Sequence, residues 1–315
     1  MNFDYSKFHV KEGSKVSLNH WPTCEDGGFT KKTAKEEIKE NIRELKKLQE
    51  MFYADDRYSL LIILQARDAA GKDGVIRHVM SGINPQGCRV HSFKTPTRNE
   101  LEHDYFWRHY IALPQRGMIE IFNRSHYENV LATKVNPQWI LNERIPGYET
   151  VDKIGQPFWD QRYDSINAIE HHLHQNGMRI LKFFLHVSKE EQKERFLSRI
   201  DEPDKNWKFS SSDLHARSQW DAYDQAFEEM LEKTSKPYAP WFVIPADKKF
   251  FTRVAVGDII LDLFRSLDLH YPPAESPEML AKAKIELAGE YPDSLKSTDS
   301  FFFPQMRVQA RNQPQ

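Results

Sequence analysis

The stretch SLLIILQARDAAGK, residues 59–72, decides the fold. Its first part, Ser59–Leu64, is a short continuous apolar run, which is typical of a strand buried on both faces of a parallel sheet. The glycine-containing loop Ala66–Lys72 follows and opens a helix. A loop that enters a helix N-terminus aims free backbone N–H groups and the positive end of the helix dipole at one point. The stretch therefore predicts a phosphate site.

The loop has P-loop spacing, with Ala66 in place of the first glycine and Asp73 in place of the usual Ser or Thr. That missing hydroxyl normally binds magnesium. Carboxylates beside a polyanion repel it unless a divalent cation lies between them, so Asp68 and Asp73 predict a Mg²⁺ site. The loop residues expected to contact phosphate are Ala69, Ala70, Gly71, Lys72, Asp73 and Gly74.

Strand and helix patterns alternate along the rest of the chain. Thr33–Glu36 reads as a capping box that begins a first helix. Further strands are predicted at Val90–Phe93, Met118–Phe122, Ile180–Val187 and Trp241–Ile244, and helices at Gly71–Ser81, Arg98–Ile111, Arg124–Leu131, Pro157–His174, Lys189–Ile200, Asp213–Lys233 and Phe250–Leu267. Capping boxes at Thr97–Glu100 and Ser188–Glu191 support two of these helices. The alternation predicts a three-layer α/β/α fold with a parallel central sheet and right-handed crossovers.

Three parts are expected along the 315 residues. Residues 1–32 form an N-terminal arm that is laid over the core or used in subunit contact. Residues 33–270 form the phosphotransferase domain, with a helical lid at about 200–218. Residues 271–315 hold one helix, at Pro277–Gly289, and a polar tail.

Bulk composition excludes several classes of protein. The formal charge of −2 gives no global positive field that would gather nucleic acid, so anion binding must be local. No apolar run approaches the roughly 20 residues that span a bilayer, and no secretory signal is visible. Cys24 and Cys88 make no metal-ligand pattern. We expect a cytoplasmic protein without membrane or nucleic-acid partners.

Polar residues follow a second apolar run at the sequence Asn123-Arg-Ser-His-Tyr-Glu128. Ligands of open parallel sheets bind at the carboxyl ends of strands, so this segment should face the loop. Asn123 stands where P-loop kinases usually place an aspartate that holds the metal through water, and Arg124 can grip a phosphate. Together with Asp68 and Lys72, the residues Asn123, Arg124 and Glu128 are the predicted catalytic set.

A basic stretch near residue 200 predicts the lid. A phosphoryl-transfer enzyme needs cations that close over the reacting group, exclude water and neutralise developing charge. The predicted phosphate ligands are Arg195, Arg199, Lys208 and Arg217, although Asp201, Glu202 and Asp204 dilute the patch. Taken alone, such a stretch equally fits a solvated charged hairpin.

These motifs together resemble the polyphosphate kinase 2 family. The resemblance rests on ARDAAGKDG, FNRSHYENV, LKFFLHVSKEEQKERF, WKFS and APWFVIPADKKFFTR, which cover about residues 59–267 in the family's order. It implies a thymidylate-kinase-like P-loop fold, use of Mg²⁺, and phosphate transfer between polyphosphate and nucleotides. Asp68 and Lys72 match the family's loop residues, Asn123 and Arg124 its second motif, and the four lid cations its basic positions.

Asn123 and His126 depart from many family members, which have Asp and Trp at these positions. Loss of that carboxylate leaves the number of metal ligands open. The Asn-Arg-Ser-His-Tyr-Glu version resembles the class III branch, which implies AMP and ADP as acceptors, stepwise phosphorylation toward ATP, and so ATP regeneration. The segment TRNELEHDYFWR matches a helix near the acceptor site, where Asp104 and Arg108, with Arg124, are candidate nucleotide ligands. GMP and GDP stay open as acceptors, and a homo-oligomer, dimer or tetramer, is expected.

Two other functions share these features. A nucleoside monophosphate kinase with a nucleoside triphosphate donor would have the same fold and loop. A non-catalytic polyanion- or nucleic-acid-binding protein would use the basic patch, but the charge of −2 and the lack of aromatic residues interleaved with basic ones disfavour it.

Overall fold

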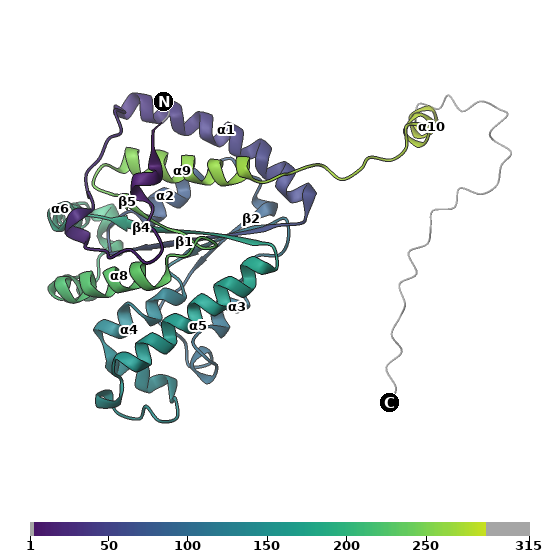
Figure 1. The fold of residues 1–315 in the computed structure, drawn as a ribbon. Coiled ribbons are helices and arrows are strands. Elements are labelled where there is room, and N and C mark those ends of the chain that lie inside the picture. Colours follow the sequence, from purple (N-terminus) through teal and green to yellow (C-terminus); the bar gives the residue numbers. More distant parts are fainter. Residues whose placement is uncertain (1–2, 288–315) are drawn as a thin grey trace, which may run out of the picture. The chain divides into compact units, whose positions relative to one another are not determined.

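A parallel sheet forms the centre of the protein (Figure 1). The computed structural model describes residues 3–287, and within them five strands pair in the order β2-β3-β1-β4-β5. Every strand pair is parallel. The strands are β1 (Ser59–Ala66), β2 (Cys88–Ser92), β3 (Ile119–Asn123), β4 (Met178–His186) and β5 (Trp241–Pro245). The predicted parallel α/β fold is confirmed.

Helices cover both faces of the sheet, as Figure 1 shows. One face carries α1 (Lys31–Asp55), α2 (Lys72–Val79) and α9 (Lys249–Ser266). The other carries α3 (Trp107–Tyr110), α4 (Ala132–Val135), α5 (Gln156–Gln175) and α8 (Trp220–Thr234), and α6 (Lys189–Asp201) and α7 (Ser211–Ser218) lie between β4 and α8 in the chain. Short 3-10 helices occur at Tyr5–Phe8, Leu18–His20, Pro85–Gly87, Glu100–Glu102, His126–Asn129, Pro137–Glu143, Val151–Lys153 and Pro203–Lys208. The core is therefore split into two apolar layers by the sheet.

The central strand, β1, is buried along its whole length. All eight residues of β1 are buried, because β3 and β4 flank its edges and helices cover both of its faces. Alternate side chains enter opposite layers: Ile62 packs in one apolar cluster and Ile63 in the other. A continuous apolar run is what such a doubly covered strand requires.

The N-terminal arm closes one edge of the sheet. His9 forms an antiparallel bridge with Phe242 of β5, and Val10 N–H donates to the Trp241 carbonyl at 2.9 Å. Phe8 and Val10 are buried. The described part of the arm is thus laid over the core, which was one of its two predicted roles.

Four local predictions were wrong. Helix α1 begins at Lys31 because Thr30 and Thr33 cap it reciprocally, with N–H to Oγ1 distances of 3.2 and 2.9 Å, so the box at Thr33–Glu36 does not form. The helix predicted at Asp213–Lys233 is interrupted at Gln219, which separates α7 from α8.

The other two wrong helices lie near the loop. The Thr97–Glu100 box forms, but only a 3-10 turn follows it, since His103 is extended and the chain becomes helical again at Trp107. No helix spans Arg124–Leu131 because Arg124 is left-handed and Ser125 is extended; a 3-10 turn starts at His126.

The chain divides into two compact units, residues 1–271 and 272–315. The second contains α10 (Pro277–Leu287). The last two residues of the predicted Pro277–Gly289 helix, and the predicted polar tail, lie outside the described residues. Over residues 3–287, no helix has the length and apolar character that a membrane crossing needs. The three-part domain division stays a prediction.

Protonation of His186 should destabilise the fold. Burial lowers the pKa of this imidazole, at the end of β4, from 6.5 to about 4. The folded state then binds fewer protons than the unfolded state. The contribution of His186 to the free energy of unfolding is therefore fully present above pH 6.5 and is lost as the pH drops toward 4, by about 3 kcal/mol in total. Urea unfolding of wild type and His186→Asn between pH 7.5 and 4.5 should show a weaker pH dependence in the variant. The exposed His20→Asn is the control, and equal slopes for wild type and His186→Asn would contradict the prediction.

Candidate active site

The phosphate loop joins β1 to α2. Gly71 caps α2 with φ of 113°, and Ala69 has φ of 61°, a left-handed conformation that is costly for a residue with a side chain. Lys72 Nζ donates to the Ala66 carbonyl at 3.0 Å, so the lysine folds back across the loop. Burial and the nearby Arg124 lower the pKa of Lys72 to about 8. The loop thus concentrates positive charge above the end of β1.

Arg195 holds this loop in place. The side chain is 7% exposed, and its Nη1 donates to the carbonyls of Ala69 and Ala70 at 3.0 and 2.7 Å. Its Nη2 donates to the carbonyls of Ala246 and Asp247 at 2.6 and 3.1 Å, and its Nε to Glu191 at 2.8 Å. A guanidinium has five N–H donors, and all of them are engaged. Arg195 therefore holds the loop, and its part in phosphate binding stays a prediction.

The predicted catalytic residues of two strand ends meet. Leu64 of β1 pairs with Asn123 of β3, and the Arg124 N–H donates to the Leu64 carbonyl at 3.1 Å. Asn123 Nδ2 donates to Asp73 Oδ1 at 2.7 Å, and Arg124 Nη2 contacts Asp68 Oδ1 at 2.5 Å. Arg124 itself is left-handed, with φ of 63°. The loop after β1 and the segment after β3 therefore each contain a residue in a strained backbone conformation, Ala69 and Arg124.

A small cavity of about 50 Å³ lies at this meeting point. Charged and polar side chains that line it are Arg67, Asp68, Arg124, Glu128, Gln192, Arg217 and Tyr223. The larger hollow of about 570 Å³ lies elsewhere, between the arm and α9 beside Phe3 and Leu263, and holds none of the predicted site residues. The candidate active site is therefore recognised by the charged side chains that converge on the smaller cavity, and not by the volume of that cavity.

The carboxylates fit a magnesium ion that is shared with substrate. Among residues 3–287 no group of three or more His, Cys, Asp or Glu side chains is placed to hold a metal ion alone. Mg²⁺, however, usually takes one or two carboxylates and completes its octahedron with water and phosphate oxygens. Asp68 is a quarter exposed and Asp73 is exposed at the helix start. Both can offer oxygens, while the Asn123 amide donates to Asp73.

The lid connects to the loop through Gln192. Arg217 Nη1 donates to Gln192 Oε1 and to the Lys189 carbonyl, both at 2.8 Å, and Gln192 Nε2 donates to the Asp68 carbonyl at 3.0 Å. Arg199 contacts the Lys208 carbonyl at 3.3 Å, and Lys208 is exposed. The structure thus brings Arg217 to the cavity, while Arg199 and Lys208 lie further out on the lid.

The acceptor candidates have local partners. Asp104 Oδ1 accepts from the Phe106 N–H at 2.9 Å, and so caps the short turn that follows. Arg108 donates to the Lys94 carbonyl at 2.9 Å and lies 3.4 Å from Glu100. Their part in nucleotide binding stays a prediction.

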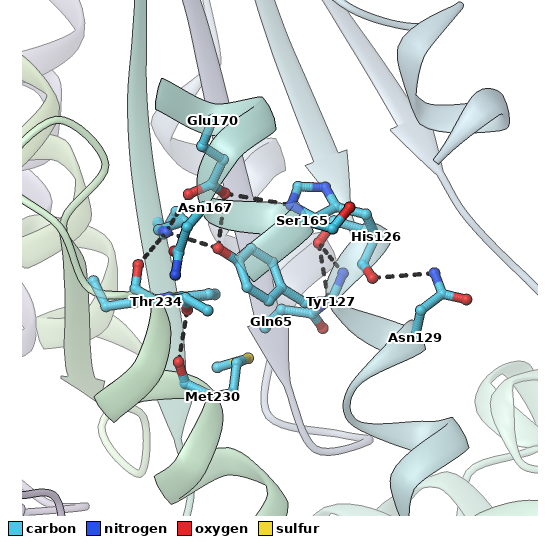
Figure 2. A network of polar contacts seen from close by, with 12 residues as sticks. Gln65, His126, Tyr127, Asn129, Ser165, Asn167, Glu170, Met230 and Thr234 are labelled. Atoms are coloured by element: carbon cyan, nitrogen blue, oxygen red, sulfur yellow. Dashed lines mark hydrogen bonds and ion pairs between the residues drawn. The ribbon is translucent and has the colours of Figure 1, made fainter. Parts of the chain in front are cut away.

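A buried polar cluster holds the segment that follows β3 (Figure 2). Lys182 Nζ on β4 donates to Glu170 Oε2 at 2.6 Å and to Tyr127 Oη at 2.7 Å, and Tyr127 Oη donates to Glu170 Oε1 at 2.7 Å. His126 Nε2 reaches the same oxygen at 3.3 Å. Lys182 and Glu170 are at most 1% exposed, and breaking such a pair costs about 3–5 kcal/mol because one buried charge is left alone. The cluster fixes the two residues that precede Glu128.

Sequence reasoning missed three polar residues around the loop. Gln65 is completely buried at the end of β1. Arg67 stacks on Trp220 at 3.8 Å, bonds the Trp220 carbonyl at 2.9 Å and pairs with Asp224. Arg253 Nη2 lies 3.6 Å from where a Cβ on Gly74 would stand. A polar residue directly after the apolar run of β1 was the available signal for Gln65; for Arg253 it was the place of this residue at the end of the motif APWFVIPADKKFFTR.

The fold and site together define a phosphotransferase of the P-loop type: a parallel sheet whose central strand enters a phosphate loop, with a lysine, arginines and carboxylates at the strand ends. The sequence pattern described as Polyphosphate kinase 2 (PPK2) matches residues 28–270. The chain belongs to the polyphosphate kinase 2 family, and the resemblance seen in its motifs is confirmed.

Individual relatives cover nearly the whole chain. It is similar to an ADP-polyphosphate phosphotransferase of Rhodopseudomonas palustris, 49% identical over 284 residues, which is 89% of this chain and 97% of that protein. An AMP/ADP-polyphosphate phosphotransferase of Meiothermus ruber is 40% identical over 86% of this chain and 96% of its own length. The crystal structure of polyphosphate kinase 2 from Arthrobacter aurescens matches with a TM-score of 0.79 and 36% identity, over 88% of this chain and 95% of that one.

Replacing Arg195 with lysine should separate loop holding from phosphate binding. Lysine keeps the charge but cannot bridge four carbonyl groups, so we expect Arg195→Lys to lose about 2–3 kcal/mol of stability and most of the turnover rate. Thermal melting and initial rates measure both. Arg199→Lys, one helical turn away, is the matched control and should melt like wild type. Wild-type stability of Arg195→Lys, with only a raised KM for the phosphate donor, would instead support the original phosphate contact.

Proposed function

We propose that this chain transfers phosphoryl groups from inorganic polyphosphate to AMP and ADP, and so makes ATP, with Mg²⁺. One observation carries the proposal: Asp68, Lys72 and Arg124 converge at the ends of β1 and β3 in a chain whose relatives, matched over most of their length, are named for these acceptors. The metal would lie against Asp68 and Asp73 and supply charge compensation to the phosphate oxygens.

Positioning and charge compensation account for the chemistry. The acceptor's terminal phosphate oxygens are already ionised near neutral pH, so no strong general base is needed. Lys72 and Arg124 would hold the transferred group from the loop side, and Arg217, with Arg199 and Lys208, would cover it from the lid. Glu128 lies in the same cavity, where its charge favours the protonated form of Arg124 and raises the pKa of that guanidinium.

A second group of cations marks a path for the rest of the donor chain. Arg77 on α2 and Lys249 and Arg253 on α9 make no ion pair or side-chain hydrogen bond with any of residues 3–287. Burial, and then Arg77, lowers the pKa of Arg253, which lies beside Gly74 of the loop. Burial, and then Arg195, lowers the pKa of Lys249, while Glu191 opposes this. Clustered cations that form no ion pair of their own are stabilised when a polyanion lies across them.

We also expect a cytoplasmic homo-oligomer, a dimer or tetramer, with residues 1–32 as an arm, 33–270 as the catalytic domain and about 200–218 as its lid. GMP and GDP are further acceptors to examine. The absence of a positive net charge argues against nucleic acid as a partner and requires that polyphosphate be bound by local cations.

A donor assay tests the proposal. Purified protein with Mg²⁺ is incubated with polyphosphate and AMP, ADP, GMP or GDP in turn, and the products are resolved; we expect ADP and ATP from the adenine nucleotides. Asp68→Asn should keep the melting temperature and lose at least about 100-fold in rate, because the carboxylate that pairs with Arg124 and offers a metal ligand is gone. Transfer from ATP but none from polyphosphate would favour an ordinary nucleoside monophosphate kinase.

Arg253→Gln and Lys249→Gln should weaken polyphosphate binding selectively. Each removes a cation next to the loop, so we expect the KM for long polyphosphate to rise about tenfold at low salt while the KM for nucleotide stays unchanged. Lys46→Gln, on an exposed position of α1, is the control. An equal rise in both KM values, or none, would remove this path from the proposal.

A further inference from the structure

Gln65 stands at the junction of the two halves of the site. It is the second-last residue of β1, directly before the phosphate loop, and its side chain is 0% exposed. In the amide orientation that satisfies both polar atoms, Nε2 donates to Glu128 Oε1 at 3.0 Å, while Oε1 accepts from the Ser125 N–H and Oγ, both at 3.1 Å. The opposite orientation would turn a carbonyl oxygen toward a carboxylate and an amino group toward an N–H. Only the first orientation is chemically reasonable.

Neither Glu128 nor the Ser125 N–H has another hydrogen-bond partner that could replace Gln65 in the described part of the chain. Within residues 3–287, the Gln65 amide is the one hydrogen-bond donor to the Glu128 carboxylate, and it is the one acceptor for the buried Ser125 N–H. A buried N–H without an acceptor costs about 1–3 kcal/mol. Gln65 is therefore tied to the β3 end by two bonds that cannot easily be replaced.

The partner segment is itself immobilised. Tyr127 N–H donates to Ser125 Oγ at 3.2 Å, and the Tyr127 hydroxyl belongs to the buried Lys182–Glu170 cluster. Figure 2 shows Gln65 beside this cluster, with His126 and Tyr127 between it and Glu170. The segment that carries Glu128 is therefore fixed, and Gln65 is fixed as part of β1, so the hydrogen bond between their side chains has a defined geometry.

The position of the Glu128 carboxylate decides which neighbouring charges it pairs with. It shares the cavity with Asp68, Arg124, Arg217 and Tyr223. Lys72 adds a further positive charge near by, and Asp68 already bonds Arg124. A carboxylate free to rotate could pair fully with either cation and neutralise a group that is needed for phosphate.

We propose that Gln65 is a positioning residue: its amide holds the Glu128 carboxylate so that Arg124 and Lys72 remain directed at the transferred phosphoryl group. The inference rests on the proposed function and adds to it a residue that does not touch substrate. It explains why a hydrogen-bonding side chain interrupts the apolar run of β1.

Gln65→Glu gives a readout that a merely structural role would not produce. When protonated, the new side chain copies the amide, since its O–H donates to Glu128 and its carbonyl accepts from Ser125. Burial next to a carboxylate raises its pKa, so this form persists to near-neutral pH and is lost as the pH rises. We expect kcat near wild type at about pH 6 and a loss that grows to at least about tenfold by pH 9.

Gln65→Met fills the same volume without hydrogen bonds. Its kcat should fall at least about tenfold at every pH, parallel to wild type, with nucleotide KM changed less. In a Glu128→Gln background the same substitution should cost little more, because residues that act as one unit are not additive. Asn41→Leu is the matched control: its buried amide also donates to a carboxylate, that of the partly buried Asp258, at 2.5 Å and outside the cavity, so it should lower the melting temperature and leave kcat unchanged.

Wild type and variants are compared at each pH with polyphosphate and ADP, and melting temperatures are recorded in parallel. A Gln65→Glu profile parallel to wild type, wild-type kcat in Gln65→Met, or full additivity with Glu128→Gln would overturn the inference. An inactive wild type would contradict the proposed function instead, so the two failures are distinguishable.

Discussion

A loop that turns its N–H groups toward an anion must turn its carbonyl groups the other way, and the structure depends on what receives them. In this chain Arg195 receives the carbonyls of Ala69 and Ala70 on one side and of Ala246 and Asp247 on the other. One guanidinium therefore fixes the loop after β1 to the segment after β5. The left-handed Ala69 is tolerated because this contact leaves the loop few alternatives.

Opposite charges lie close together around that loop. The protein as a whole carries −2, yet the ends of β1 and β3 collect Lys72 and Arg124, balanced by Asp68 and Glu128. Arg124 pairs with Asp68, and Lys72 donates to the Ala66 carbonyl, so both cations have partners without substrate and a phosphate must displace or bridge these contacts. Local pairing, instead of a global field, gives selectivity for a ligand that fits the pocket.

The sequence allowed the architecture and the central chemistry to be predicted, because both depend on local patterns. The apolar run of β1 and the loop after it required a parallel sheet, and the strand-end rule brought Asn123 and Arg124 to the loop, where they contact Asp73 and Asp68.

What could not be predicted depends on contacts distant in sequence. Arg195 was expected to contact phosphate, and only the folded chain reveals that its N–H groups also hold the phosphate loop. The helix predicted at Arg124–Leu131 does not form, because the left-handed conformation of Arg124 cannot be recognised from a hydrophobic pattern. Gln65 resembled a minor interruption until its partners across the sheet were known.

The covering of β5 by the N-terminal arm has a consequence for the order of synthesis. Val10 reaches its partner Trp241 only after more than two thirds of the chain has been made. Until then the first residues have no strand to bind, and β4 waits with an open edge. Contacts between such distant segments form late and slowly. During translation, the arm leaves the ribosome long before β5 and is therefore among the last segments to settle, and the nascent sheet is most exposed to mispairing just before β5 emerges.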